Sequence, residues 1–329
     1  MARRNNNKMT HRQKKIQPSP MTLTLATAVS APGVTLRSYI DLSQCVSLMS
    51  RRFYRQGLNW AVSGFKITST QPGFSVVSKV PTTWVASGAW HKTFALWNKQ
   101  INETLEDGGN ESLRARFSDF KVFADVQHRT AGKGANLLPI DSAGVPATVG
   151  EWDMSHVVLP QTAADGSGTL IDPTEFTLHM VGASTGTSKG IIEGYADSRA
   201  FPQSPDPVGP IAGAATNWMS AMFDDGSANP EILDNAENEN DDLPYPQADY
   251  PGGATQVLNL AWHDFTQIYA TSATTNVGIQ RMKGGMFPCG LVAIDWTPAP
   301  DAVAANLVIQ IDLVPGDHRG YLCEPMQDM

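Results

Sequence analysis

The stretch NLVIQIDLVP, residues 306–315, has a clear β-strand pattern. Every second residue in it is apolar, and this set comprises Leu307, Ile309, Ile311 and Leu313. Alternate side chains of a strand share one face of the sheet. The pattern therefore predicts a strand with one face in a hydrophobic core.

The same period of two recurs elsewhere in the chain. In VTLRSYIDL, residues 34–42, the apolar side is formed by Val34, Leu36, Ile40 and Leu42. Further strand-like segments are residues 59–69, 73–81, 120–126, 151–160, 175–182, 189–199, 255–272 and 286–296. Many short strands separated by turn residues are typical of an antiparallel sandwich or barrel. We therefore expect an all-β protein with long surface loops.

One segment has a different period. The apolar positions between residues 87 and 105 lie three or four apart and are Trp90, Phe94, Trp97, Ile101 and Leu105. This spacing places them in a single stripe along an α-helix. The sequence therefore predicts one amphipathic helix over about 87–105, with Ser87 as its cap and its aromatic stripe packed onto a sheet.

Charge is distributed unevenly along the chain. The 329 residues have a formal net charge of -8. Residues 1–66 contain eleven Lys or Arg and one acid, which gives +10, so residues 67–329 carry -18. Such asymmetry indicates two surfaces that meet different environments.

Six of these cations lie in a basic arm, which we place at residues 1–20. They are Arg3, Arg4, Lys8, Arg12, Lys14 and Lys15. Few apolar residues accompany them, so the arm cannot offset the entropy lost on folding and is predicted to be disordered. A flexible cationic tether can follow phosphate groups without sequence selectivity, because its binding releases counterions.

A second basic motif, RRFYR, combines three cations with two aromatic rings. Its residues are Arg51, Arg52, Phe53, Tyr54 and Arg55. Arginine beside exposed rings suits single-stranded nucleic acid, through phosphate contact and base stacking. In the alternative, the rings belong to the core and the arginines pair with carboxylates. The sequence leaves both interpretations open.

Residues 200–253 differ in composition from their surroundings. They hold eight prolines, nine acids between residues 224 and 249, and no Lys or Arg. We expect an exposed acidic insertion in a domain that spans residues 21–329. A solvated run of charge is favoured over a cation site, because the spacing of an EF-hand is absent.

Residues 182–186, GASTG, match the G-x-S-x-G motif of hydrolases. That motif holds its serine, here Ser184, between a strand and a helix. The residues that follow resemble another strand, so we favour a hairpin and predict no enzymatic activity. Neither the histidines nor the cysteines show metal-ligand spacing, so we expect no metal or other cofactor.

The sequence also bears on the compartment. No apolar run approaches the ~18 residues that span a bilayer, so no membrane partner is expected. Residues 21–31, MTLTLATAVSA, follow basic residues as a secretory signal would, but three threonines interrupt them. The widely spaced Cys45, Cys289 and Cys323 indicate reduced thiols and an intracellular place of synthesis.

Two stretches carry a resemblance to a known family. They are SRRFYRQGLNWAVSGFKI, residues 50–67, and TTWVASGAWHKTFALWNKQ, residues 82–100. This part of the chain resembles the capsid proteins of small circular Rep-encoding single-stranded DNA viruses, especially pecovirus-like and circovirus-like faecal viruses. The resemblance is diffuse outside residues 50–100.

The resemblance implies a single jelly-roll β-sandwich, with two four-stranded antiparallel sheets, over residues 21–329. It implies an icosahedral homo-oligomer that packages circular single-stranded DNA, present in the virion and, during assembly, in the host nucleus. The basic arm would then double as a nuclear localisation signal. Circovirus-like arms are often longer and richer in arginine, so we expect Arg51, Arg52 and Arg55 to contribute DNA contacts on the inner wall.

Two other functions remain open from the sequence. One is a β-sandwich module that binds host glycans. The other, less favoured, is a hydrolase that uses Ser184. The sequence identifies no host receptor.

Overall fold

The computed structural model describes most of the chain in seven segments. These are residues 18–50, 52–114, 119–162, 170–198, 218–221, 259–269 and 277–328. The basic arm up to residue 17 therefore lies outside the described residues, as does the acidic stretch 200–253 apart from residues 218–221.

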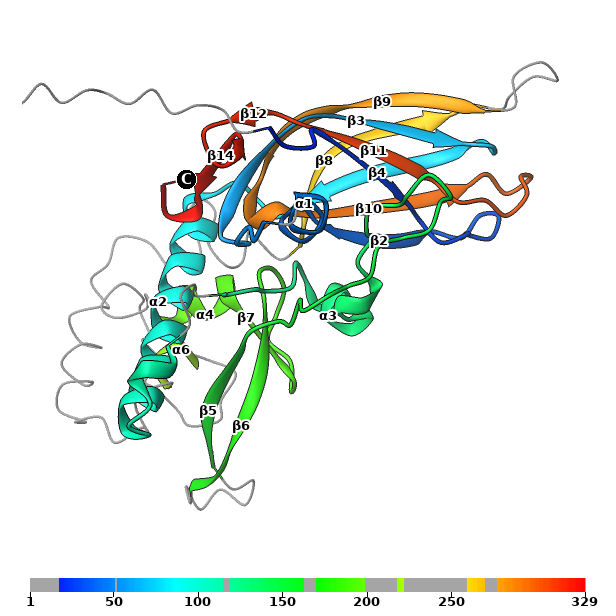
Figure 1. The fold of residues 1–329 in the computed structure, drawn as a ribbon. Helices are drawn as coiled ribbons and strands as arrows, with labels where there is room; N and C mark the ends of the chain where they lie inside the picture. The colour runs from blue at the N-terminus through cyan, green and yellow to red at the C-terminus, as the bar shows by residue number, and fades with distance from the viewer. Residues whose placement is uncertain are drawn as a thin grey trace, which may run out of the picture.

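The main body is a sandwich of two antiparallel sheets (Figure 1). One sheet has the order β1-β11-β3-β14, with β9 paired to the other edge of β3. Its strands are β1 (Thr22–Ala26), β3 (Leu58–Ser69), β9 (Gly278–Phe287), β11 (Val308–Leu313) and β14 (Cys323–Pro325). The other sheet has the order β2-β10-β4-β8. Its strands are β2 (Leu36–Asp41), β4 (Gly73–Lys79), β8 (Ala261–Ile268) and β10 (Leu291–Pro298). The mostly-β sandwich predicted from the sequence is confirmed.

Strand β11 forms as the alternation in residues 306–315 predicts. It lies between β1 and β3 and pairs with both. Leu307, Ile309 and Ile311 are fully buried in the core between the two sheets, whereas Asp312 is exposed. Period two identifies the buried face correctly here because the other face of this sheet meets solvent.

Strand β2 departs from the simple alternation in residues 34–42. Tyr39 and Ile40 point to opposite faces, yet both are buried. Ile40 joins the core between the sheets, while Tyr39 joins a second core with Leu291 and Ala293 of β10. The four-stranded sheet is therefore covered on both faces.

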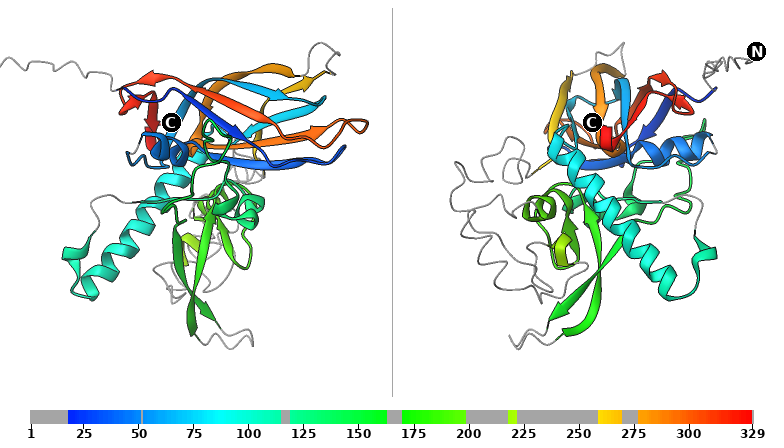
Figure 2. Two further views of the ribbon diagram at one scale, coloured as in Figure 1. Left: turned by 45° about the vertical axis from the view of Figure 1, so that its right-hand side comes forward. Right: turned by 90° about the vertical axis from the view of Figure 1, so that its left-hand side faces the viewer.

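The second cover is an insert between β4 and β8, residues 80–260. Its described elements are α2 (Trp84–Asp107), α3 (Val126–Ala131), β5 (His156–Thr162), β6 (Leu170–His179), β7 (Ser188–Gly190), α4 (Ile191–Ser198) and α6 (Trp218–Ala221). Strands β5, β6 and β7 form a separate three-stranded sheet. The insert lies below the sandwich in Figure 1 and stays on that side in both turned views of Figure 2. Three segments predicted as strands of the sandwich, 120–126, 151–160 and 175–182, thus belong to the insert.

The strand predicted over residues 189–199 is wrong. Only its first residues form β7, and α4 begins at Ile191. Ile191 and Ile192 are buried, and a Cβ on Gly194 would lie 1.9 Å from Nε1 of Trp218. The pair of isoleucines fits a buried strand as well as a helix, so the local pattern could not decide between them.

The segment 120–126 is extended but is not a strand of a sheet. A single bridge joins Phe123 to His179, and α3 begins at Val126. The alternate side chains that fill the core of the insert are Phe120, Val122 and Ala124. In this segment the alternation of apolar residues reflects one buried side of the chain, although the segment is not a strand of a sheet.

Helix α2 confirms the amphipathic helix predicted at 87–105 and is longer at both ends. Its cap is Thr83, whose hydroxyl accepts the amide hydrogen of Ala86. The hydroxyl of Ser87 donates instead to the carbonyl of Met326. The first aromatic residues of the stripe pack around Phe120 of the insert, whereas Ile101 is 36% exposed.

Further short elements complete the fold, so α2 is not the only helix. They are α1 (Leu42–Ser50), the strands β12 (Pro315–Gly316) and β13 (Gly320–Tyr321), and 3-10 turns at Glu111–Leu113, Lys133–Ala135, Pro288–Gly290 and Met326–Asp328. Among the described residues, no helix is both long enough and apolar enough to cross a membrane.

Candidate nucleic-acid interface

The segment between α1 and β3, which carries the RRFYR motif, is held by a buried polar network. Asp41 is fully buried at the start of α1, and its carboxylate accepts the amide hydrogens of Ser43 and Gln44. Gln56 Nε2 and Trp152 Nε1 each donate to Oδ2 of Asp41 at 3.0 Å. Burial raises the pKa of Asp41 to about 6, although these hydrogen bonds oppose the shift.

Gln56 links this network to the insert. Its side-chain amide donates to the carbonyl of Val122 at 3.0 Å and accepts the amide hydrogen of Val122 at 2.7 Å. Trp152, which donates to Asp41, also belongs to the insert. The arginine-bearing segment is therefore fixed to the sandwich and to the insert together.

The two rings of the motif are not a stacking platform. Tyr54 is fully buried, packs against Trp60 and Tyr321, and donates its hydroxyl to the carbonyl of Arg319. Phe53 is partly buried and packs on Trp152. Of the two interpretations that the sequence left open, burial of Tyr54 in the core is the correct one.

The same interpretation pairs the arginines of the motif with carboxylates, and the structure supports this part less fully. Arg51 lies outside the described residues, while Arg52 and Arg55 are exposed. No hydrogen bond or ion pair of the Arg55 guanidinium is formed within the described residues. Arg55 is therefore an exposed cation at this end of the sandwich.

Sequence reasoning missed a third cation, Arg319. Its backbone lies at a φ of 52°, and its guanidinium donates to the carbonyl of Phe53 at 2.6 Å. The adjacent His318 is half-buried, and burial lowers its pKa, with the charges of Arg319 and Arg55 lowering it further. An isolated arginine about 260 residues from the motif gives no local signal, so only the fold could bring them together.

The root of the basic arm lies at the same place. The hydroxyl of Ser19 donates to the carbonyl of Arg319 at 3.0 Å, and Tyr321 donates its hydroxyl to the carbonyl of Pro20 at 2.7 Å. Burial raises the pKa of Tyr321, and the nearby Ser19 and Arg52 oppose that shift. We call this region, formed by residues 18–20, Arg52, Arg55, His318 and Arg319, the basic end. The six arm cations that the sequence singles out are among residues 1–17, outside the described part.

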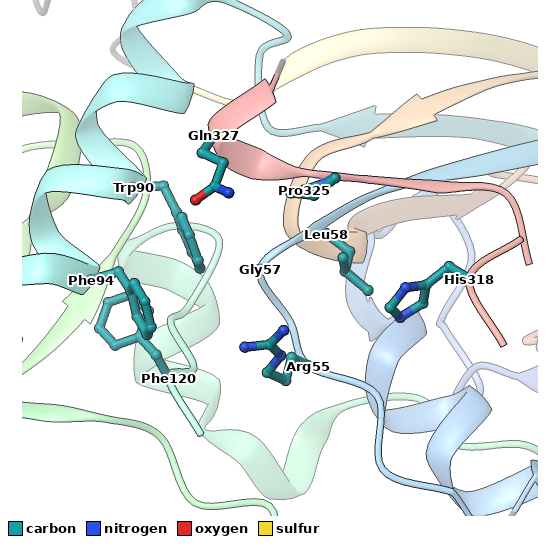
Figure 3. A pocket seen from close by; sticks show the side chains of 9 residues that line it. All are labelled: Arg55, Gly57, Leu58, Trp90, Phe94, Phe120, His318, Pro325 and Gln327. Carbon is teal, nitrogen blue, oxygen red and sulfur yellow. The ribbon is translucent and has the colours of Figure 1, made fainter. Parts of the chain in front are cut away.

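A cavity of about 280 Å³ opens beside the basic end (Figure 3). Its principal lining residues are Arg55, Leu58, Trp90, Phe94, Phe120 and His318. Trp90 and Phe94 come from α2, and the C-terminal segment with Pro325 and Gln327 closes another side. Gly57 allows this approach, because a Cβ at that position would lie 2.1 Å from Cζ2 of Trp90.

The G-x-S-x-G segment is not the hairpin expected from the sequence, because β6 and β7 are parallel and α4 follows β7. The hydroxyl of Ser184 accepts the amide hydrogen of Gly190, and its own amide donates to Glu193. The nearby His179 bonds to the hydroxyl of Ser188. Within the described residues, no histidine is hydrogen-bonded to Ser184, and β7 separates it from the next helix.

The described residues contain no group of three or more His, Cys, Asp or Glu side chains able to hold a metal ion. Comparison of the chain with protein-family models, with curated proteins and with solved structures found no match.

Proposed function

We propose that this chain is a viral capsid protein that assembles into an icosahedral shell and packages circular single-stranded DNA through its basic arm. The resemblance of residues 50–100 to capsid proteins of small circular Rep-encoding single-stranded DNA viruses implies this role. The order of the strands and the position of the basic end support it independently.

The sandwich is, in this proposal, a single jelly roll. The first four long strands pair in order with the last four, as β1 with β11, β2 with β10, β3 with β9 and β4 with β8. Rolling such a long double hairpin into two facing sheets produces the jelly-roll order, which is common in viral capsid proteins. The insert then occupies the connection between the fourth and fifth long strands.

One observation carries the DNA-packaging part of the proposal: the root of the arm and Arg52, Arg55 and Arg319 lie together at one end of the sandwich. Cations gathered where a cationic tether begins form one surface for a polyanion. In this proposal, we assign the net charge of -18 on residues 67–329 mainly to the outer surface and to the contacts between subunits. The basic end therefore faces the packaged DNA.

This orientation also gives the arm two tasks at different times. Before assembly, its six cations act as a nuclear localisation signal in the host cell. After assembly, the same cations neutralise phosphate groups within the virion.

The test is purification of the full chain and of a variant that lacks residues 1–16, followed by negative-stain electron microscopy and absorbance at 260 and 280 nm. We expect both proteins to form uniform shells, because the described core of the sandwich begins at Met21. We expect only the full chain to contain nucleic acid. A variant of unchanged length, with the six arm cations replaced by glutamine, is the matched control for loss of charge alone.

Two results contradict the proposal. Absence of shells from the full chain would remove the capsid assignment. Equal absorbance ratios in full-length and truncated particles would leave the shell but remove the role of the arm in packaging.

A second candidate function is a host-glycan-binding module, and an exposed aromatic surface favours it. On and beside β8, Trp262 is 68% exposed, Phe265 58% and Tyr269 67%. Phe265 also contacts Phe74 of the neighbouring strand at a ring-centroid distance of 5.7 Å. Rings of this kind stack on sugars, and a monomer or dimer in size-exclusion chromatography would support this function over the capsid.

A further inference from the structure

The cavity beside the basic end combines an aromatic wall with a cation. Trp90 and Phe94 are stacked with centroids 5.2 Å apart, and Phe120 meets both rings edge-on at 5.8 and 5.7 Å. Arg55 lies across the cavity from these rings, and His318 lies beyond Leu58 on that side (Figure 3). The site therefore has an apolar side and a positive side.

The cation in this cavity is available to a ligand. Arg55 is exposed, and its guanidinium makes no hydrogen bond or ion pair within the described residues. A guanidinium presents a planar set of donors that matches the oxygens of a phosphate. A small inorganic anion or a neutral apolar ligand would use only one side of the cavity, whereas a nucleotide uses both.

The size of the cavity limits what it can hold. Its volume of about 280 Å³ lies near the lower end of ligand pockets, which run from roughly 300 to 1,000 Å³. This space suits a single base with its sugar and is too small for a base pair. Only an unpaired strand can place one base there.

We infer that this cavity binds one nucleotide of single-stranded DNA, with the base against the partly buried Phe94 beside Trp90 and the phosphate on Arg55. The inference rests on the proposed function and adds a defined base-binding position to it. Contact between a base and aromatic side chains favours binding of single strands without selecting a sequence. Gln327, whose side chain is exposed, lines the cavity on the side of the C-terminal segment.

The position of the cavity supplies the route for the strand. His318 precedes Arg319, whose carbonyl accepts the hydroxyl hydrogen of Ser19 at the root of the arm. A strand drawn in by the arm therefore reaches the mouth of the cavity without crossing the sandwich. The arm provides general affinity for phosphate, and the cavity fixes one nucleotide against each subunit.

Photo-crosslinking of the full chain to a 5-bromodeoxyuridine decamer tests this inference, with peptide mapping by mass spectrometry. We expect adducts on residues 80–92 or 93–99, the tryptic peptides that hold Trp90 and Phe94. Arg55→Gln should reduce this labelling about tenfold, because the phosphate loses a charge-assisted contact. Phe94→Leu, a second variant that keeps an apolar side chain, should reduce it as well.

The matched control is Arg281→Gln. Arg281 is an exposed arginine of β9 that pairs with Lys66, eight residues along β3 from Leu58 at the cavity, or ~26 Å away at the rise of a strand. This variant should leave the labelling of the two peptides unchanged. Electron microscopy of each variant verifies that shells still form.

The outcomes separate the two proposals. Adducts confined to residues 1–16 in intact, DNA-filled shells would overturn the cavity inference and leave the capsid function standing. Absence of both shells and adducts would overturn the function itself. A second crosslinking experiment uses the monophosphate of 5-bromodeoxyuridine in place of the decamer. If the monophosphate labels the same peptides at the same concentration, the cavity binds a free nucleotide, and the assignment to a strand is overturned.

Discussion

The buried carboxylate of Asp41 should make the stability of this fold depend on pH. Burial raises the pKa of this group from an ordinary value of 3.8 to about 6, so the folded state binds the proton more tightly than the unfolded chain does. The resulting stabilisation is fully present below pH 3.8 and is lost as the pH rises through 6. The perturbation that isolates it is Asp41→Asn, which removes the titration and keeps the size of the side chain.

The structure gives the magnitude. A shift of about two pKa units, at 1.36 kcal/mol per unit, corresponds to about 3 kcal/mol. The free energy of unfolding of the asparagine variant, minus that of the native chain, should therefore increase by about 2.4 kcal/mol between pH 4 and pH 7, because the carboxyl of the unfolded chain is already more than half ionised at pH 4. Its absolute value also includes the changed hydrogen bonds to Gln56 and Trp152, but that contribution does not depend on pH in this range.

The assay is urea unfolding of unassembled protein at pH 4, 5, 6 and 7, followed by tryptophan fluorescence. Subtracting the native curve from the variant curve cancels the titration of all other groups. The exposed Asp301→Asn is the control and should give a difference within about 0.5 kcal/mol at every pH. A difference between Asp41→Asn and the native chain that stays constant from pH 4 to pH 7 would refute the reasoning.

Two further substitutions test the packing. Gly57→Ala places a Cβ 2.1 Å from Cζ2 of Trp90. We therefore expect the free energy of unfolding to fall by about 1–3 kcal/mol and crosslinking in the cavity to decrease. Native values of both quantities would contradict the packing. Ile309→Ala removes a fully buried side chain between the sheets and should lower the free energy of unfolding by about 2–5 kcal/mol, whereas Gln310→Ala on the other face should change it by less than about 0.5 kcal/mol. Urea unfolding measures both, and equal effects at 309 and 310 would mean that the register of β11 is misassigned.

The sequence predicted strands best where one face meets the core and the other meets water. Residues 306–315 satisfy this condition, and β11 forms there. The sequence predicted poorly wherever the insert covers a second face, as at Tyr39, because no alternation survives there. An alternation of apolar residues does not specify which sheet a strand joins. The sequence therefore places residues 151–160 and 175–182 in the sandwich, whereas β5 and β6 belong to a separate sheet.

The candidate site was predictable only in part. The composition of the RRFYR motif pointed to Arg52 and Arg55, and the structure places both at the basic end. The aromatic wall was visible as a stripe on a helix, but its spacing indicated burial alone. Arg319, His318 and Gln327 come from a distant segment, and the pairing of β14 with β3 helps to bring that segment to the cavity.

The pairing of β1 with β11 has a consequence for synthesis of the chain. Thr22 and Asp312 are paired although 290 residues separate them. At translation rates of roughly 5–20 residues per second, the first strand waits about 15–60 s on the ribosome before its partner emerges. During that interval Leu23 and Leu25 lack the β11 side of their core, so these two side chains cannot be buried as in the folded protein until translation is nearly complete.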